Sequence, residues 1–265
     1  NNLFPLTYPV KPAGMVYRPP SNAVRMLLMG DREKERSVKV GSLLARKDVE
    51  ATLSARRLVS RHLAIFAMTG GGKTVASRRI IRELIEQGYP LFILDPHGDY
   101  IGLSKCQDIL KSVTPSCSIK LYYPDLLMQK NGEDIVTKLI FQMSSGLTDP
   151  QADYIRGLYE RKPVQEGQSA LEYIKTLLTQ ANNDKGGASA PAGMAQNWKG
   201  SIGAVIRGLK IVKDRLDRMR VSSEQMRKSP KLQDLPFEAL PNPFGQPDEI
   251  IRPGQVSILY LGGYD

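Results

Sequence analysis

The sequence has few of the residues that support disulfide or metal chemistry. It contains two cysteines, two histidines and one tryptophan among 265 residues. Two cysteines, Cys106 and Cys117, exclude a disulfide framework and a zinc site built on cysteine, and two histidines argue against a histidine-rich metal centre. No apolar run approaches the roughly 20 residues that cross a bilayer, so no membrane span is predicted. These absences predict a reduced, cytoplasmic protein.

Basic residues, by contrast, are in excess. The sequence has 37 Lys and Arg against 27 Asp and Glu, a net charge of +10, and its pI is near 9.5. Hydrophobic residues at 41% and charged residues at 24% are close to globular averages, which excludes a disordered chain. The length suits one large domain, with or without a small appendage. The charge suits contact with the phosphates of an anionic polymer.

The first 46 residues are predicted to form a separate module. Residues 1–20 contain five prolines and few helix signals. Apolar residues then alternate at 24–28 and again at 38–40, which favours strands, with a turn at Gly30-Asp31 between them. The sequence therefore predicts a small β module over residues 1–46, followed by the main domain over residues 47–265.

The main domain alternates between strand and helix patterns. Apolar runs at 63–67 and 91–94 predict buried strands. Between them, residues 74–87 have the apolar period of a helix, and Gly88 marks its end. Further strands are predicted at 119–123 and 256–261. This alternation predicts an α/β fold with a parallel sheet and helices on its faces.

A helical insertion is predicted at about residues 133–220. Its first helix is expected at 133–143 and its longest at 195–220, where apolar residues recur at helical spacing. Residues 182–193 have the composition of a mobile loop. The proline-rich stretch 230–253 is expected to be a connector.

The strongest motif is Ala67-Met68-Thr69-Gly70-Gly71-Gly72-Lys73-Thr74, between an apolar run and an amphipathic helix. Successive glycines let several backbone N–H groups converge on a phosphate, and the helix dipole favours the same anion. Lys73 would contact the β- and γ-phosphate oxygens of ATP, and the Thr74 hydroxyl would ligate Mg²⁺. Ala67 replaces the usual first glycine, at a position that only needs to be small. The predicted nucleotide-binding residues are Thr69, Gly70, Gly71, Gly72, Lys73, Thr74, Val75 and His97.

A second polar motif, Asp95-Pro96-His97-Gly98-Asp99-Tyr100, follows the second strand. Ligands bind at the carboxyl ends of parallel strands, so Asp95 and Asp99 could orient Mg²⁺-bound water and His97 could contact the nucleotide. The same residues fit a turn in which Asp95 caps the next segment and Gly98 supplies an unusual backbone angle. The residues alone leave both interpretations open. The motif lies too close to Lys73 for a GTPase, and no guanine-reading Asn-Lys-x-Asp follows.

Three segments together resemble the HerA family of hexameric DNA translocases: Arg61-His62-Leu63-Ala64-Ile65, the glycine-rich loop, and Asp95 to Tyr100. The close match covers about residues 40–102. It implies a RecA-like P-loop ATPase core with a helical insertion, preceded by a HAS barrel that is only partial here. It also implies catalytic roles for Lys73, Arg61 and Asp95, with Arg61 reaching the nucleotide of a neighbouring subunit.

The sequence differs from the family at the position of the catalytic glutamate. The family places its catalytic glutamate one strand beyond the segment that matches residues 256–261, and no such residue precedes Asp265. The sequence starts at Asn1 and not at methionine. We therefore expect this chain to be a fragment of a longer protein.

The resemblance implies a homo-hexameric ring that hydrolyses ATP at subunit interfaces and moves double-stranded DNA. Its expected partner is a NurA-like nuclease in DNA repair, or an effector protein in antiviral defence, with no membrane involved. One alternative is an ATP-binding ring scaffold that activates an effector with little DNA movement. Another is a DNA pump of the FtsK or conjugation type. No DNA-binding residue is assigned, because charged helix faces are mostly solvated, but the candidates are Arg207, Lys210, Lys213, Arg215, Arg218, Arg220 and Lys231.

Overall fold

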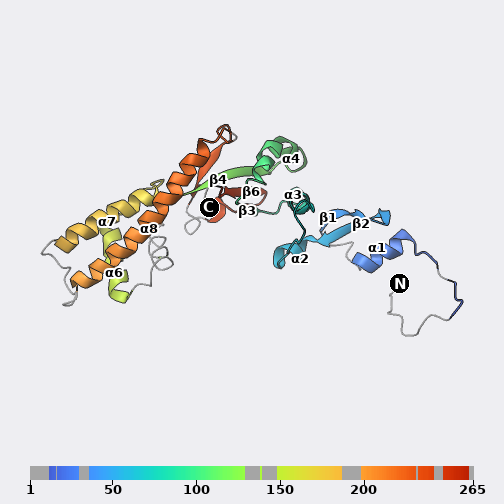
Figure 1. The fold of residues 1–265 in the computed structure, drawn as a ribbon, viewed down its shortest axis with the longest axis horizontal. Coiled ribbons are helices and arrows are strands. Elements are labelled where there is room, and N and C mark those ends of the chain that lie inside the picture. Colours follow the sequence, from blue (N-terminus) through green and yellow to red (C-terminus); the bar gives the residue numbers. More distant parts are fainter. Residues whose placement is uncertain are drawn as a thin grey trace. The chain divides into compact units, whose positions relative to one another are not determined.

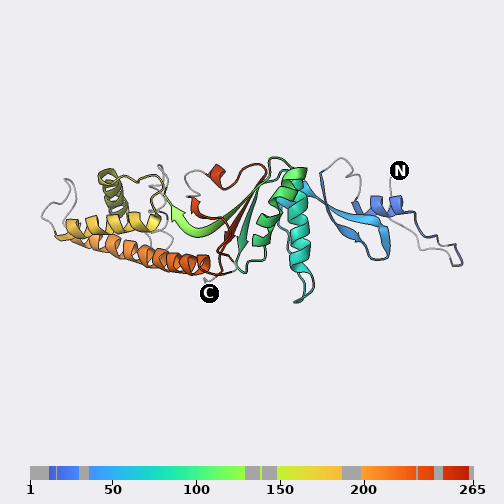
Figure 2. The ribbon, with the colours of Figure 1, turned by 90° about the horizontal axis from the view of Figure 1, so that it is seen from above.

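The computed structural model describes residues 12–15, 17–29, 36–128, 138, 148–186, 198–230, 232–241 and 247–262. The chain divides into two compact units, residues 1–89 and residues 90–265. Each unit is described by itself. Figures 1 and 2 show the helices and strands of both units.

A hairpin and a helix organise the first unit. Strands β1 (Ser37–Leu43) and β2 (Arg46–Ser54) pair antiparallel and bury Val38 and Val49. The side chain of Gln87 donates to the Ser37 carbonyl at 2.9 Å, just after the end of α3, which fixes that helix beside β1. The helices of this unit are α1 (Ser21–Met29), α2 (Ala55–Ser60) and α3 (Lys73–Glu86).

Two predictions for the first unit are wrong. Residues 24–28 lie in helix α1 and not in a strand, because Met26, Leu27 and Leu28 are consecutive good helix formers. Residues 63–67 form no strand, and Phe66 is 92% exposed. A strand is held by ladder hydrogen bonds to neighbours, and none of the described strands pairs with this run.

Other predictions for this unit have mixed outcomes. The strand at 38–40 and the helix at 74–87 are confirmed as β1 and α3. The N–H of Gly88, which has φ +78°, donates to the Ile85 carbonyl, as expected for a helix end. The turn at Gly30-Asp31 lies outside the described residues. The proposed module boundary at residues 46 and 47 falls inside the hairpin.

The second unit contains a four-stranded sheet with the order β3-β6-β4-β5, and all three pairings are parallel. The predicted α/β fold with a parallel sheet is therefore confirmed. Strand β5 lies within the stretch expected to be a connector, which corrects that prediction. The strands are β3 (Leu91–Asp95), β4 (Ser118–Leu127), β5 (Phe237–Pro241) and β6 (Gln255–Tyr260). The short helical elements near them are η2 (Ile101–Cys106), α4 (Gln107–Val113) and η3 (Pro247–Glu249).

A helical region lies between β4 and β5 in the sequence. It contains α6 (Asp149–Arg161), α7 (Ala170–Gly186) and α8 (Trp198–Arg227). The three helices share one core, in which Ile155, Ile174 and Leu209 are fully buried. Three helices therefore make up most of the described part of the predicted insertion, and α8 continues seven residues beyond residue 220.

Two further predictions concern this region. The loop predicted at 182–193 needs correction, and most of the helix predicted at 133–143 lies outside the described residues. Residues 182–186, expected in a loop, belong to α7, which continues to Gly186, and the rest of that stretch lies outside the described residues. Of the helix expected at 133–143, only Lys138 is described, and its backbone is helical.

A polar clip joins two of these helices. The Tyr154 hydroxyl of α6 donates to Asp184 of α7 at 2.7 Å, and Arg161 donates to both oxygens of the same carboxylate at 2.8 and 3.2 Å. Burial, together with the hydrogen bond to Asp184, raises the pKa of Tyr154. The clip satisfies half-buried polar groups and fixes α6 against α7.

Candidate phosphate-binding site

The glycine-rich loop has a backbone that two of its glycines make possible. Gly70 and Gly72 adopt φ of +78° and +84°, in the left-handed region that side chains disfavour. The N–H of Gly71 donates to the Met68 carbonyl at 2.9 Å and closes the turn. Helix α3 begins at Lys73, directly after Gly72, and no side chain caps its first turn. The loop therefore ends at a helix start whose backbone donors suit an anion.

Gly71 is required for a different reason. A Cβ atom there would lie 2.9 Å from the Cβ of Ala67 and 2.9 Å from the Met68 carbonyl oxygen, which is closer than real Cβ atoms approach. At Gly70 and Gly72 a Cβ would meet nothing within 4 Å. Space is thus limiting at Gly71, and backbone conformation is limiting at its two neighbours.

Lys73 folds back over the loop. Its Nζ atom donates to the Ala67 carbonyl at 2.7 Å and lies 3.5 Å from the Met68 carbonyl. Both acceptors are neutral, and no carboxylate in the described part of the chain pairs with Lys73, so its ammonium group remains available to a stronger anionic partner. Thr74 follows in the first helical turn, and its carbonyl accepts from Ser77. The structure therefore brings together the predicted residues from Thr69 to Val75.

Arg61 precedes this loop in the same unit. It is the C-cap residue of α2 and is exposed, with extended backbone angles. An exposed guanidinium at this position is available to a partner molecule, and the structure assigns it no role.

The predicted second motif belongs to the other unit, where it forms a closed turn. Asp95 ends β3 and is 1% exposed. Its two carboxylate oxygens accept from the N–H groups of Asp99 at 2.9 Å and Tyr100 at 2.8 Å. Gly98 has φ +77°, and a Cβ there would lie 3.3 Å from the Tyr260 ring. Of the two interpretations, the structure shows the capping turn, with His97 exposed on it.

Sequence reasoning missed a polar cavity in the second unit. It has a volume of about 200 Å³ and lies where β4 meets α7 and α8. Burial raises the pKa of Asp125, which accepts from the Ser169 hydroxyl at 3.5 Å. The lining residues come from separate segments, so no local motif could have indicated them: Tyr123, Asp125, Ser169, Glu172, Arg220, Ser223, Glu224 and Arg227.

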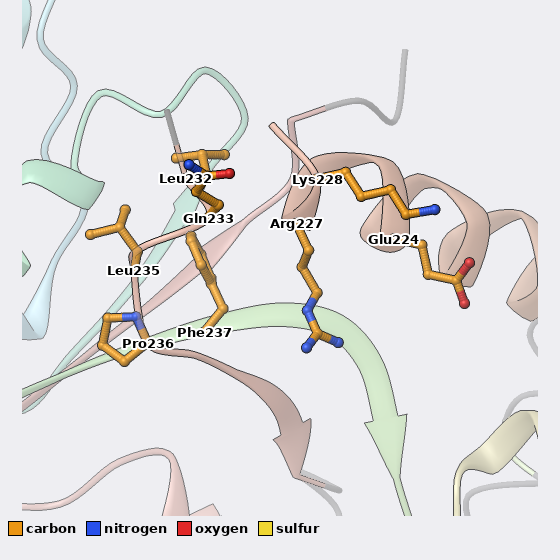
Figure 3. Close-up of a pocket in the computed structure, with 8 residues that line it drawn as sticks. All are labelled: Glu224, Arg227, Lys228, Leu232, Gln233, Leu235, Pro236 and Phe237. Carbon is orange, nitrogen blue, oxygen red and sulfur yellow. The ribbon is translucent and has the colours of Figure 1, made fainter. Parts of the chain in front are cut away.

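A larger cavity of about 590 Å³ shares Glu224 and Arg227 with the first. In Figure 3 the Arg227 guanidinium points toward the sheet, while Lys228 points away from it. The guanidinium carbon lies 5.2 Å from the centroid of the Tyr123 ring, a cation–π contact. This contact anchors the C-terminal end of α8 on the sheet.

The described residues show neither a metal-binding cluster nor a membrane-spanning helix. No group of three or more His, Cys, Asp or Glu side chains there could hold a metal ion. Within the same ranges, every helix is too short or too polar to span a bilayer.

The loop and the sheet define a class of protein. A glycine-rich phosphate loop at the start of a helix, in a chain with a parallel sheet flanked by helices, is typical of P-loop proteins with a RecA-like core. Residues 38–265 match the family model described as "Helicase HerA, central domain", and the chain belongs to that family. The predicted resemblance is thereby confirmed.

Individual relatives match over shorter stretches. The chain is 36% identical over 104 residues to the DNA double-strand break repair helicase HerA of Pyrococcus furiosus. It is 44% identical over 64 residues to a probable protein of the same description from Methanocaldococcus jannaschii. A probable helicase of that organism is 30% identical over 144 residues.

These matches cover 39%, 24% and 53% of this chain. They cover only 18%, 13% and 26% of the three relatives. The chain thus spans about a quarter or less of the length of each relative. No solved structure gave a significant match.

Proposed function

We propose that this chain is the nucleotide-hydrolysing part of an ATP-dependent DNA translocase or helicase. The observation that carries the proposal is the phosphate loop, with two left-handed glycines, a third glycine without room for a side chain, and an uncapped helix start. Membership of the HerA family supports it, as do relatives that are named DNA repair helicases.

In this proposal each residue of the loop contributes to binding MgATP. Backbone N–H groups of the loop and of the first turn of α3 hold the β-phosphate, while the Gly71 N–H stays on the Met68 carbonyl. Lys73 exchanges its two carbonyl partners for the β- and γ-phosphate oxygens, where negative charge is greatest. The Thr74 hydroxyl is a ligand for Mg²⁺, which neutralises charge that develops on the transferred phosphoryl group.

Roles outside the loop are also proposals. Arg61 reaches the nucleotide of a neighbouring subunit in a homo-hexameric ring, where a permanently charged planar donor stabilises the transferring γ-phosphoryl group. Asp95 caps the turn that follows β3, and His97 is exposed on that turn. We assign the water-activating base to none of the described residues. The ring moves double-stranded DNA and works with a nuclease or a defence effector.

The test compares ATP turnover by the full-length protein with and without double-stranded DNA, in wild type and in Lys73→Ala. We expect DNA to stimulate turnover, and we expect the variant to lose at least about a hundredfold, because a charge aimed at the transferring phosphate is removed. Lys105→Ala, which removes another exposed lysine, is the matched control and should keep its turnover.

Two results would change the conclusion. ATP binding without DNA-stimulated turnover would favour the alternative of an ATP-binding scaffold. Failure of wild type to bind any nucleoside triphosphate would overturn the proposal altogether.

A further inference from the structure

Helix α8 has a fixed orientation in the second unit. Its inner face is buried through Ile202, Leu209 and Leu216, in the core shared with α6 and α7. Arg227 anchors its C-terminal end over the Tyr123 ring. Figures 1 and 2 both show α8 running alongside α7. Side chains on the side of α8 that faces away from this core are therefore held on a rigid support.

Two of its six basic residues between positions 207 and 220 are neutralised by neighbours. Lys213 Nζ lies 2.8 Å from Asp217 and 3.1 Å from Asp214. Arg220 Nε lies 3.1 Å from Glu224. Hydrogen bonds to these carboxylates raise the pKa of Lys213 and of Arg220. This flank of the helix carries little net charge.

The other four basic residues are exposed, and their surroundings differ from those of Lys213 and Arg220. Arg207, Lys210, Arg215 and Arg218 have no carboxylate within 4.0 Å among the residues that the structure describes. Arg218 Nε donates only to a backbone carbonyl, that of Asp214. At 100° per residue the four positions fall within one sector of about 140°. We call this sector the outer face of α8.

The outer face has the chemistry of a phosphate-contacting surface. Arg207 and Arg218 are about 16 Å apart along the helix, a length over which duplex DNA carries roughly ten charges. Between residues 207 and 218 this sector also holds Asp214, whose carboxylate pairs with Lys213, and one exposed apolar residue, Ile211, so it lacks the apolar anchors of a protein interface. The same stretch contains no Asn or Gln to read bases.

We infer that the outer face of α8, formed by Arg207, Lys210, Arg215 and Arg218, binds the phosphate backbone of duplex DNA without reading its sequence. The inference rests on the proposed function for its choice of DNA as the partner. It divides the six basic residues of the helix into four that contact DNA and two that do not.

The experiment compares two charge-matched double variants of the full-length protein. Arg207→Gln/Arg218→Gln removes two charges from the outer face, and Lys213→Gln/Arg220→Gln removes two from the neutralised flank. Affinity for a labelled duplex is measured without nucleotide over a range of salt concentrations. We expect the outer pair to weaken binding at least about tenfold at 0.1 M salt and to lower the salt slope by about 1.8, whereas the flank pair changes little.

Two controls accompany the comparison. Arg207→Lys/Arg218→Lys should keep most of the affinity, because a point charge suffices for phosphate contact. Thermal melting of each variant shows that the fold is retained. ATP turnover without DNA, measured on the same preparations, tests the nucleotide site separately.

Three outcomes would overturn the inference. Equal losses in both double variants would mean that net charge alone governs binding. Unchanged binding in both would place the DNA elsewhere and leave the proposed function intact. If wild type bound no duplex while ATP turnover persisted, the DNA part of the proposed function would fail as well, and an acidic protein would become the expected partner of this face.

Discussion

The turn after β3 and the glycine-rich loop before α3 both contain glycine with a positive φ angle. They differ in which groups accept hydrogen bonds from their backbone N–H groups. In the turn after β3, the Asp95 carboxylate accepts from the N–H groups of Asp99 and Tyr100. In the loop before α3, no side chain caps the helix start. In the turn after β3, a carboxylate of the chain itself accepts from the backbone N–H groups. At the start of α3, the backbone N–H groups are available to a phosphate. The Asp95 carboxylate therefore distinguishes the first turn from the second.

The largest effect is expected from a variant that places a side chain in the glycine-rich loop before α3. Gly71→Val places a side chain where even a Cβ would be 2.9 Å from the Met68 carbonyl oxygen, so the loop must deform. We expect ATP affinity to fall roughly a hundredfold, which corresponds to losing one or two charge-assisted hydrogen bonds. Titration with a fluorescent ATP analogue measures the change.

Gly88→Ala is the control for that variant. It changes another left-handed glycine at the opposite end of α3, where a Cβ would have open space. It should cost about 1 kcal/mol of stability and leave ATP affinity unchanged. Equal losses of ATP affinity in both variants would mean that α3 as a whole, and not the loop, determines binding.

The second test removes the anion of the closed turn. Asp95→Ala leaves two N–H groups without their acceptor beside a buried position, and we expect the free energy of unfolding to fall by about 3 kcal/mol. Asp95→Asn keeps one acceptor and should lose about half as much. Urea denaturation measures both. If Asp95→Asn instead folded normally and lost ATP turnover, Asp95 would act in catalysis and the two turns would no longer contrast.

The smallest expected effect concerns Asp125, a carboxyl group near the end of β4 that is held by no such pair of N–H groups. Burial raises its pKa above the ordinary value of 3.8. A raised pKa means that the folded state binds the proton more tightly, so this contribution to stability is present below 3.8 and is lost as pH rises through the raised value.

Asp125→Asn should therefore remove a small decline in stability over that pH window. Urea denaturation of wild type and variant at several pH values provides the measurement. A parallel pH dependence in the two proteins would show that Asp125 is solvated and does not differ from an ordinary surface carboxyl.

Local patterns allowed parts of this structure to be predicted from the sequence. The loop and α3 were predictable because glycine conformation, helix period and the Gly88 end all act within a few residues. Strands β3, β4 and β6 were predictable as apolar runs that a buried parallel sheet requires.

Features that depend on distant partners were not predictable. Strand β5 has Glu238 and Pro241 within five residues, and it is a strand because it pairs with β4. The polar cavity combines β4, α7 and α8, which are far apart in the sequence. For Asp95, the residues alone fitted a metal role and a cap equally well, and the cap is seen only in the positions of the Asp99 and Tyr100 N–H groups.

The length of α8 has a mechanical consequence. Its 30 residues form one helix of about 45 Å that is buried in the helical core at one end and held by Tyr123 at the other. If the helical region rotated by 5° about the Arg227 contact, the far end of α8 would move by about 4 Å. The contact between Arg227 and Tyr123 would pass such a movement to strand β4.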